Sequence, residues 1–248
     1  MGKQELKYIF NDTKRKAWIG NLISTKTSKM KEVSVDINPP IIVMVTDTVT
    51  AATKFVRLGK TCVLNMASAK KAGGGVADGE TAQEECLFRC SNLSTSITQD
   101  LYPLAEDEAL YTKNAIFFKD KYYNDMPMIK VDVVTVASVN LNVNAKYDEK
   151  NEVWVDGIIS KPDNYWELTK MKIRTMLSLA AKNKCKYIIL GAWGCGVFKN
   201  DPEDIADAFY EVLVDEGYDR LFTQVVFAII NDNNSYGNNV QIFREVFD

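Results

Sequence analysis

Residues 61–90, TCVLNMASAKKAGGGVADGETAQEECLFRC, decide the fold. Residues Cys62–Met66, which are mostly apolar, predict a strand. The glycines Gly73–Gly75 follow in a loop whose sequence suits no regular element. Residues Thr81–Glu84 match a capping box, which predicts a helix from about Thr81 toward Leu93. A buried strand that leads through a glycine-rich loop into a helix is typical of an α/β sheet.

The same alternation of strand and helix continues on both sides of this stretch. Short apolar runs predict strands at 41–45, 115–118, 131–138, 187–190 and 225–230. Capping residues and helical spacing predict helices at 48–58 after Asp47, from Asp163 or Asn164 to about Lys184, from Asp201-Pro202 onward and at 240–247. Residues up to about Ser28 have helical spacing too, Pro39-Pro40 stops any helix there, and 140–162 has the composition of a loop-like insertion. Continuous apolar strands that alternate with amphipathic helices predict an α/β fold with a mixed sheet covered on both faces.

The 248 residues include no histidine. Mechanisms that need an imidazole are therefore excluded, among them the Ser-His-Asp and Cys-His nucleophiles and the HExxH zinc hydrolases. The hydrophobic share of 46% and the charged share of 25% are ordinary globular values. A chain of this length fits a single hydrophobic core.

The cysteines form an odd set of five without a CxxC pair: Cys62, Cys86, Cys90, Cys185 and Cys195. The first residues carry no signal-peptide pattern, and no apolar run approaches about 18 residues. We therefore expect no membrane span and a cytoplasmic or otherwise intracellular protein in a reduced compartment. Most of these thiols should be packed in the core.

The net charge of −3 conceals an uneven distribution. Residues 1–31 carry eight Lys or Arg and only two acidic residues, Glu5 and Asp12, so the remainder of the chain is acidic. The basic segment is either the solvated face of a helix or an arm that favours a polyanionic substrate. Proteins that neutralise duplex phosphates usually have a basic domain, so nucleic-acid binding is not the expected activity.

A second glycine loop, Gly191–Phe198, also leaves an apolar strand and enters a helix. Exposed N–H groups and the helix dipole attract anions at such junctions, so two of these loops favour a ligand that carries phosphate. Gly191 and Gly196 have the spacing of a P-loop, but Val197-Phe198 stands where Lys and Ser or Thr belong. Lys199 occupies the third glycine position of a dinucleotide fingerprint, so neither standard nucleotide motif is present.

Two adjacent carboxylic acids, Glu84 and Glu85, follow the first glycine loop at the predicted helix N-terminus. They either interact favourably with the helix dipole or place a carboxyl beside a bound phosphate sugar, where it donates a proton to a glycosidic oxygen. Neighbouring residues on a helix differ by about 100° in direction, so at most one of the two points at the scissile bond. The other would bind hydroxyl groups.

Gly73-Gly74-Gly75, seven intervening residues and Gln83-Glu84-Glu85 resemble the GGG-x(6–8)-QEE signature of the poly(ADP-ribose) glycohydrolases, a branch of the macrodomain superfamily. Residues 64–70 and 191–202 resemble the bacterial-type, or microbial, subgroup. The resemblance covers most of the chain from about residue 40.

The resemblance implies a macrodomain-like mixed central sheet with helices on both faces. An N-terminal helical extension at residues 1–38 would pack on a catalytic domain at residues 39–248. The implied partners are poly(ADP-ribose) or ADP-ribosylated protein, with ADP-ribose as product and the protein acting as a monomer. No metal and no cofactor is implied.

Carried over to this sequence, the resemblance implies that Glu85 is the catalytic carboxyl and that Glu84 binds ribose hydroxyls. The substrate-binding residues implied in the two loops are Ser68, Gly73, Gly74, Gly75, Val76, Gln83, Gly194, Cys195, Gly196, Val197 and Phe198. Cys195 would contribute its backbone rather than a thiol nucleophile, and Phe198 would pack on the ligand. Asp47 stands where many macrodomains place an acidic residue on the adenine amine.

Ser68 marks a departure, because ordinary macrodomains and the animal-type enzymes have an asparagine near the distal ribose there. The bacterial-type pattern also has a small residue at this position, so the departure indicates the subgroup. The nearby Asn65 is then left to face the core.

The implied reaction is hydrolysis of the ribose–ribose O-glycosidic bond, from chain ends. Glu85 would protonate the departing 2′ oxygen and then activate water. This needs an acid that is protonated near neutral pH, and we expect neighbouring charges to raise the pKa of Glu85 more than burial does. Two alternatives remain open: a non-catalytic ADP-ribose reader with the same pocket, and a hydrolase of mono-ADP-ribose on protein or nucleic acid. The intact QEE triplet favours an enzyme.

Overall fold

The computed structural model describes residues 1–17, 24–28, 41–143, 146–148, 153–155, 157–231 and 238–248. The predicted helix stop at Pro39-Pro40 and parts of the 140–162 insertion lie outside the described residues.

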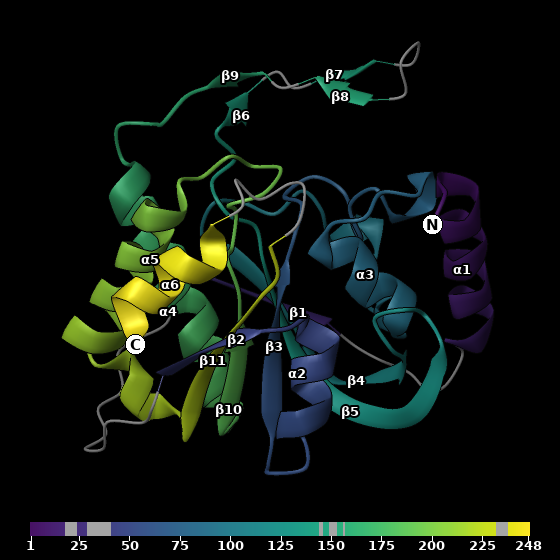
Figure 1. The fold of residues 1–248 in the computed structure, drawn as a ribbon, viewed down its shortest axis with the longest axis horizontal. Coiled ribbons are helices and arrows are strands. Elements are labelled where there is room, and N and C mark those ends of the chain that lie inside the picture. Colours follow the sequence, from purple (N-terminus) through teal and green to yellow (C-terminus); the bar gives the residue numbers. More distant parts are fainter. Residues whose placement is uncertain (18–23, 29–40, 144–145, 149–152, 156, 232–237) are drawn as a thin grey trace.

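A seven-stranded mixed sheet forms the centre of the molecule (Figure 1). Its strands are β1 (Ser24–Ser28), β2 (Ile41–Val45), β3 (Thr61–Met66), β4 (Glu108–Lys119), β5 (Asp125–Val136), β10 (Tyr187–Leu190) and β11 (Gln224–Ile229). They lie in the order β1-β4-β5-β3-β10-β11-β2. The strands from β5 to β2 are parallel, whereas β4 pairs antiparallel with both β5 and β1. The predicted α/β fold with a mixed sheet is confirmed.

Helices cover both faces of this sheet (Figure 1). They are α1 (Lys3–Lys16), α2 (Thr48–Phe55), α3 (Gln83–Cys90), α4 (Tyr165–Lys182), α5 (Pro202–Tyr210) and α6 (Asn239–Phe247). Shorter helical turns are η1 (Val76–Asp78), η2 (Leu93–Thr95), η3 (Gln99–Leu101), η4 (Glu211–Asp215, a π-helical turn) and η5 (Tyr218–Leu221). Helices α2 and α3 pack on one face and α4, α5 and α6 on the other, while α1 packs outside them, on α3 and η1. No helix in the described ranges has both the length and the apolar character that a membrane crossing requires.

Alternating side chains of the central strands build two cores, one on each face of the sheet. In β3, Leu64 packs into the core that includes Ile173 of α4. The preceding residue, Val63, points to the opposite face, where Leu87 of α3 lies. Because both faces are covered, most residues of such a strand are apolar, which is why the apolar runs predicted the central strands correctly.

The predicted starts of α2 and α5 are confirmed by their caps. Asp47 Oδ1 accepts a hydrogen bond from the Thr50 N–H at 2.9 Å, and Asp201 Oδ1 accepts one from the Glu203 N–H at 3.0 Å. Pro202 occupies the first turn of α5. Both helices therefore begin next to the loops that follow central strands.

The predicted capping box at Thr81 is wrong. Helix α3 begins at Gln83 after the N-cap residue Ala82, no side chain caps it, and it ends at Cys90 rather than near Leu93. The reason is that Glu84, the acidic partner expected in the box, turns toward the end of β3 and accepts a hydrogen bond from the Ser68 N–H instead.

The N-terminal segment is helical only in part. Helix α1 is confirmed, but Ser24–Ser28, predicted as helix, forms the edge strand β1. The backbone of β1 pairs with β4, with Ser24 opposite Thr112, so tertiary pairing decides the conformation of this polar sequence. The division of the chain at residue 38 stays a prediction, and the segment before it supplies a strand to the central sheet.

The insertion predicted as a loop contains two short antiparallel pairs, which extend away from the body (Figure 1). Strand β6 (Asn142–Val143) pairs with β9 (Ile158–Ile159), and β7 (Lys146–Asp148) pairs with β8 (Val153–Val155). At its base, the Leu141 N–H donates to Phe198 O at 3.0 Å. The insertion is therefore anchored on the second glycine loop.

Candidate active site

A cavity of about 510 Å³ lies at the carboxyl ends of the parallel strands. This volume is within the range of sites that take small molecules. Loops after β2, β3, β5, β10 and β11 contribute to its wall, because parallel strands end at the same edge of a sheet. Ten predicted site residues line it: Asp47, Ser68, Gly74, Gln83, Glu84, Glu85, Gly194, Gly196, Val197 and Phe198.

Four predicted site residues do not line the cavity: Gly73, Gly75, Val76 and Cys195. Gly75 lies just behind the wall and contacts Glu85 through its N–H. Val76 is a buried core residue of η1. The Cys195 side chain is fully buried, and its N–H donates to Ala192 O at 3.2 Å, so this loop residue presents neither thiol nor amide to the cavity. Burial also raises the pKa of the Cys195 thiol, which disfavours a thiolate nucleophile.

Glu85 has one carboxyl oxygen fixed and one without a partner. Oε1 accepts a hydrogen bond from the Gly75 N–H at 2.8 Å. Oε2 is buried and has no hydrogen-bond partner among the described residues. A proton on this carboxyl would therefore lie on Oε2, because Oε1 is already an acceptor.

Glu84 lies beside Glu85 but is held by different groups. Its Oε2 accepts from the Ser68 N–H at 2.8 Å, and its Oε1 accepts from Asn65 Nδ2 at 3.3 Å. Asn65 in turn contacts Thr135 Oγ1 of β5 at 3.3 Å, so it faces the buried interior as expected. Glu84 is thereby anchored to both β3 and β5.

Burial raises the pKa of both carboxyls. The pKa of Glu84 rises to about 8, first because of desolvation and to a smaller extent because of the charge of Glu85. The pKa of Glu85 is also raised by desolvation, against the opposing effects of the Gly75 N–H and the Arg89 charge. The expectation that neighbouring charges outweigh burial is wrong, since both side chains are at least nine-tenths buried.

Gly74 lets the backbone approach both carboxyls closely. Its φ is +57°, in the left-handed region that glycine adopts without strain. A Cβ at this position would clash with Glu85 Oε1 and would lie 3.1 Å from Glu84 Oε2. The two acids thus explain the glycine at position 74, whereas a Cβ would meet Phe88 at Gly73 and Glu80 at Gly75.

Gln83 acts as a clip between α3 and β3. Its Oε1 accepts from the Met66 N–H at 2.9 Å, and its Nε2 donates to Leu64 O at 2.7 Å and to Thr48 Oγ1 at 3.1 Å. All its polar atoms are therefore engaged within the protein, and the side chain positions Glu84 and Glu85 rather than offering groups to a ligand.

The second glycine loop is held in shape by a buried asparagine. Gly194 has a φ of +82°, and a Cβ there would lie 2.6 Å from Asn200 Nδ2. Asn200 donates to Gly194 O at 3.0 Å and to Val139 O at 2.8 Å, and it accepts from the Tyr165 hydroxyl at 2.9 Å. The backbone from Gly194 to Phe198 is fixed along the cavity, opposite the first loop.

The other end of the cavity contains a carboxylate and a lysine. Asp47 caps α2 with one oxygen, while Oδ2 has no hydrogen-bond partner among the described residues and lies 4.0 Å from Lys121 Nζ. Asp47 thus has one oxygen to offer to a ligand, and its contact with an adenine amine stays a prediction.

Several residues that line the cavity are not indicated by the sequence. They are Lys121, Tyr122 and Tyr123 between β4 and β5, Ser138 after β5, Ile230 after β11, and Asn239 at the start of α6. None belongs to a local motif, and each lies far in sequence from the two glycine loops. Only the order of strands in the sheet brings them together, so no sequence signal could have identified them.

The described part of the chain has no group of three or more His, Cys, Asp or Glu side chains arranged to hold a metal ion. The cavity is lined by two buried carboxyls, Glu84 and Glu85, and by residues of both glycine loops.

Comparison with known proteins gives one family and a consistent set of structures. The family model for the microbial-type PARG catalytic domain, PARG being poly(ADP-ribose) glycohydrolase, matches residues 4–122. A search of curated proteins found no match.

The similar solved structures are bacterial enzymes with the same fold. The poly(ADP-ribose) glycohydrolase from Thermomonospora curvata has a TM-score of 0.79 and 22% identity, over 98% of this chain and 100% of that one. The Deinococcus radiodurans enzyme in complex with ADP-ribose has a TM-score of 0.70 and 25% identity, over 98% and 90%. The Thermomonospora curvata enzyme bound to the inhibitor ADP-HPD has a TM-score of 0.71 and 23% identity, over 100% and 84%.

The family match includes both the triple-glycine loop and the QEE triplet, and the structural match extends over nearly the whole chain. Together with the paired carboxyls at the carboxyl ends of the sheet, these findings support a microbial-type poly(ADP-ribose) glycohydrolase.

Proposed function

We propose that this protein hydrolyses the ribose–ribose O-glycosidic bond of poly(ADP-ribose) and releases ADP-ribose. The observation that carries the proposal is the geometry of Glu85. One oxygen is fixed by the Gly75 N–H, the other has no partner, and burial raises the pKa of the carboxyl. A general acid must hold its proton near neutral pH and present it in one direction; the raised pKa of Glu85 acts toward the first condition, and the fixed Oε1 supports the second.

In the proposed reaction, Glu85 Oε2 donates its proton to the departing 2′ oxygen as the glycosidic bond breaks. The sugar then has oxocarbenium character, which the diphosphate of the bound unit stabilises. The resulting Glu85 carboxylate takes a proton from water, and the hydroxide adds to the sugar carbon. Glu85 returns to its protonated state, so no other proton donor is needed.

The remaining residues position the substrate. Glu84 binds ribose hydroxyls. The first glycine loop lets the backbone approach the distal ribose and the diphosphate, and the second loop, from Gly194 to Val197, wraps the diphosphate from the other side. Phe198 packs on the ligand, and Asp47 contacts the adenine amine. All four elements line or adjoin the same cavity, which supports this assignment.

Two finer features belong to the same proposal. Cleavage proceeds from chain ends, in line with the resemblance to the bacterial-type subgroup.

The protein acts as a monomer in a reduced intracellular compartment. Its five unpaired cysteines support the reduced compartment.

The test is incubation of the protein with poly(ADP-ribose) of defined length and, separately, with mono-ADP-ribosylated protein, with chromatography of the products. We expect free ADP-ribose from the polymer at early times, without intermediate oligomers. Release of ADP-ribose only from mono-ADP-ribosylated protein would contradict the proposal and would indicate a mono-ADP-ribosyl hydrolase. Binding of ADP-ribose without any release would replace it with a reader.

A further inference from the structure

Arg89 is a fully buried cation without an ion pair among the described residues. Its Nε donates to Leu6 O at 3.3 Å, its Nη2 donates to Val76 O at 3.3 Å, and its Nη1 has no hydrogen-bond partner. Buried arginines are normally paired with a carboxylate, since an uncompensated charge in the interior is costly. The charge of Arg89 therefore needs a counter-charge nearby.

Glu85 is placed to supply that counter-charge. It precedes Arg89 by four residues on α3, so the two side chains lie on the same side of the helix. Each has one polar atom without a partner, Oε2 of Glu85 and Nη1 of Arg89. Once Glu85 has given up its proton, these two atoms carry opposite charge.

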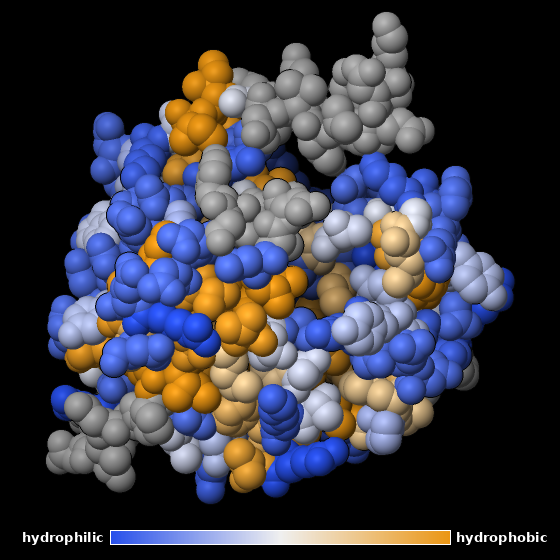
Figure 2. Space-filling view, in the orientation of Figure 1, coloured by the Kyte–Doolittle hydropathy of each residue, from blue (hydrophilic) through white to orange (hydrophobic). Residues whose placement is uncertain are grey.

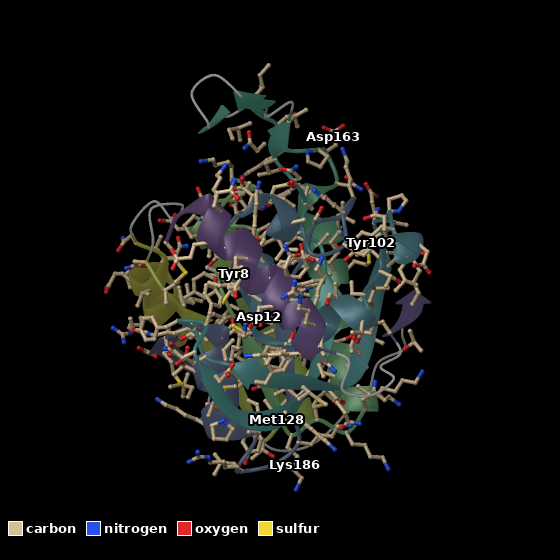
Figure 3. All side chains as sticks on the ribbon, turned by 90° about the vertical axis from the view of Figure 1, so that its right-hand side faces the viewer. Tyr8, Asp12, Tyr102, Met128, Asp163 and Lys186 are labelled. Carbon is tan, nitrogen blue, oxygen red and sulfur yellow. The ribbon has the colours of Figure 1, made fainter. Side chains whose placement is uncertain are left out.

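The backbone contacts of Arg89 join three parts of the molecule. Leu6 belongs to α1, Val76 to η1 after the triple glycine, and Arg89 itself to α3. A second hydrogen bond strengthens the contact with α1, because Thr13 Oγ1 donates to Arg89 O at 2.6 Å. Helix α1 lies across the face of the molecule that Figure 3 shows, where its residues Tyr8 and Asp12 are labelled. In the space-filling view the α1 side is mostly hydrophilic (Figure 2).

Resting on the proposed function, we propose that Arg89 is a positioning residue for Glu85: its buried guanidinium, held by backbone carbonyls of α1 and η1, is the fixed counter-charge of the catalytic carboxylate. Glu85 becomes an anion midway through the reaction, after it has given up its proton. Arg89 stabilises that anion without contacting the substrate. The N-terminal helix thereby acquires a role in the reaction, because it completes the support of Arg89.

Other ionisable groups around this pair are few. Glu84 and Glu80 are acidic neighbours of Glu85, and Glu80 is itself paired with Lys3 of α1 at 3.1 Å. Tyr123 presents its ring to the guanidinium at 5.9 Å. Arg89 is the cation whose charge lowers the pKa of Glu85, against desolvation.

The test is a carbon NMR titration of the Glu85 carboxyl, assigned by comparison with Glu85→Gln. We expect Arg89→Met to raise the Glu85 pKa by about 1 unit. Arg89→Lys should lie between that variant and the wild type, because it keeps the charge with fewer donors. The alkaline limb of kcat/KM on polymer should move up by the same amount. An unchanged Glu85 pKa in folded Arg89→Met would overturn the proposal.

Thr13→Val is the matched control, because it removes the hydrogen bond from α1 to Arg89 O, and one from Lys119, while the side chains of Arg89 and Glu85 are kept. It should lower Tm and leave the Glu85 pKa unchanged. A shift of the Glu85 pKa as large as that in Arg89→Met would show that the role of Arg89 is merely structural. A second measurement needs no change at Arg89: its Nε–H resonance should titrate with Glu85 in the wild type and lose that step in Glu85→Gln. The same step in both proteins would contradict the coupling.

These NMR measurements use no substrate, so they separate the two proposals. If polymer is not cleaved, the proposed function fails while the coupling is still decided. If Glu85→Gln is inactive but no coupling is seen, only the role of Arg89 fails.

Discussion

Gly74 and the two acids next to it form the smallest unit on which the account depends. The carboxyls of Glu84 and Glu85 approach the backbone at Gly74 so closely that no side chain fits. Gly74 has a left-handed φ and no side chain, and its backbone therefore leaves room for the two buried carboxyls. Single substitutions at these positions therefore test the site most directly.

Gly74→Ala should inactivate the enzyme. The added Cβ meets Glu85 Oε1, and alanine is strained at a φ of +57° by about 1–2 kcal/mol. Displacement of a catalytic group by about 1 Å costs on the order of 100-fold in rate, so kcat on polymer should fall at least that far. Gly2→Ala is the matched control, because a Cβ there meets nothing within 4 Å. Wild-type kcat in Gly74→Ala would contradict the placement of Glu85.

The free protein should lose stability as the pH rises from about 4.5 to 8. The pKa of Glu84 in the folded protein is about 8, above the ordinary value of 4.5 for a glutamate. The folded state therefore holds a proton that the unfolded state has released, and stability is full below pH 4.5 and declines until pH 8. The size of the loss is on the order of a few kcal/mol.

Glu84→Gln should flatten this decline, because the amide cannot ionise. Its oxygen can still accept from the Ser68 N–H, and Asn65, whose Oδ1 has no hydrogen-bond partner, can reorient to accept from the new amide. Urea unfolding at several pH values measures both proteins. An equally steep decline in Glu84→Gln would remove Glu84 as its cause.

At the scale of elements, the junction of β3 with α3 decides whether the two acids point into the cavity. Gln83 fixes this junction through three hydrogen bonds, two of them to the backbone of β3. The clip takes the place of the capping box that the sequence indicates. Local sequence thus identified the helix and misassigned its first turn, because the side chains of that turn bond to a strand rather than to the helix itself.

Gln83→Leu should destabilise the protein by about 2–3 kcal/mol, because the Met66 N–H and Leu64 O lose their partner. Its kcat should fall together with stability as α3 shifts. Gln99→Leu is a matched control on the outside of the glycine loop, where Gln99 contacts Ala72 and Lys70 but is exposed. Its effect should stay below about 1 kcal/mol. Equal losses of free energy of unfolding in the two variants, measured in urea, would contradict the claim that the Gln83 hydrogen bonds hold α3 on β3.

The elements that sequence predicted well are those whose burial is uniform. The parallel strands β3, β10 and β11 are almost wholly buried and mostly apolar, so their sequences suffice to identify them. Strand β1 has the polar sequence STKTS and exists only because β4 pairs with it. Its conformation depends on a partner more than 80 residues away, which local patterns do not contain.

At the scale of the whole molecule, the site is a consequence of strand order. The two glycine loops follow β3 and β10, which are neighbours in the sheet, so both loops meet across one cavity. The sequence predicted each loop and both acids from local motifs. It could not predict Lys121, Arg89 or Asn200, because their contacts cross elements that are distant along the chain.

The most direct test of the central claim is a paired measurement on Glu85→Gln: the rate of ADP-ribose release from poly(ADP-ribose), and the affinity for ADP-ribose by calorimetry on the same preparation. Glu80→Gln is the matched control, since this carboxyl lies near the same loop and pairs with Lys3 on the outside. We expect Glu85→Gln to lose about 1,000-fold in rate and to bind ADP-ribose within about threefold of the wild type. Glu80→Gln should keep its activity. Release of ADP-ribose by Glu85→Gln at the wild-type rate would contradict the account.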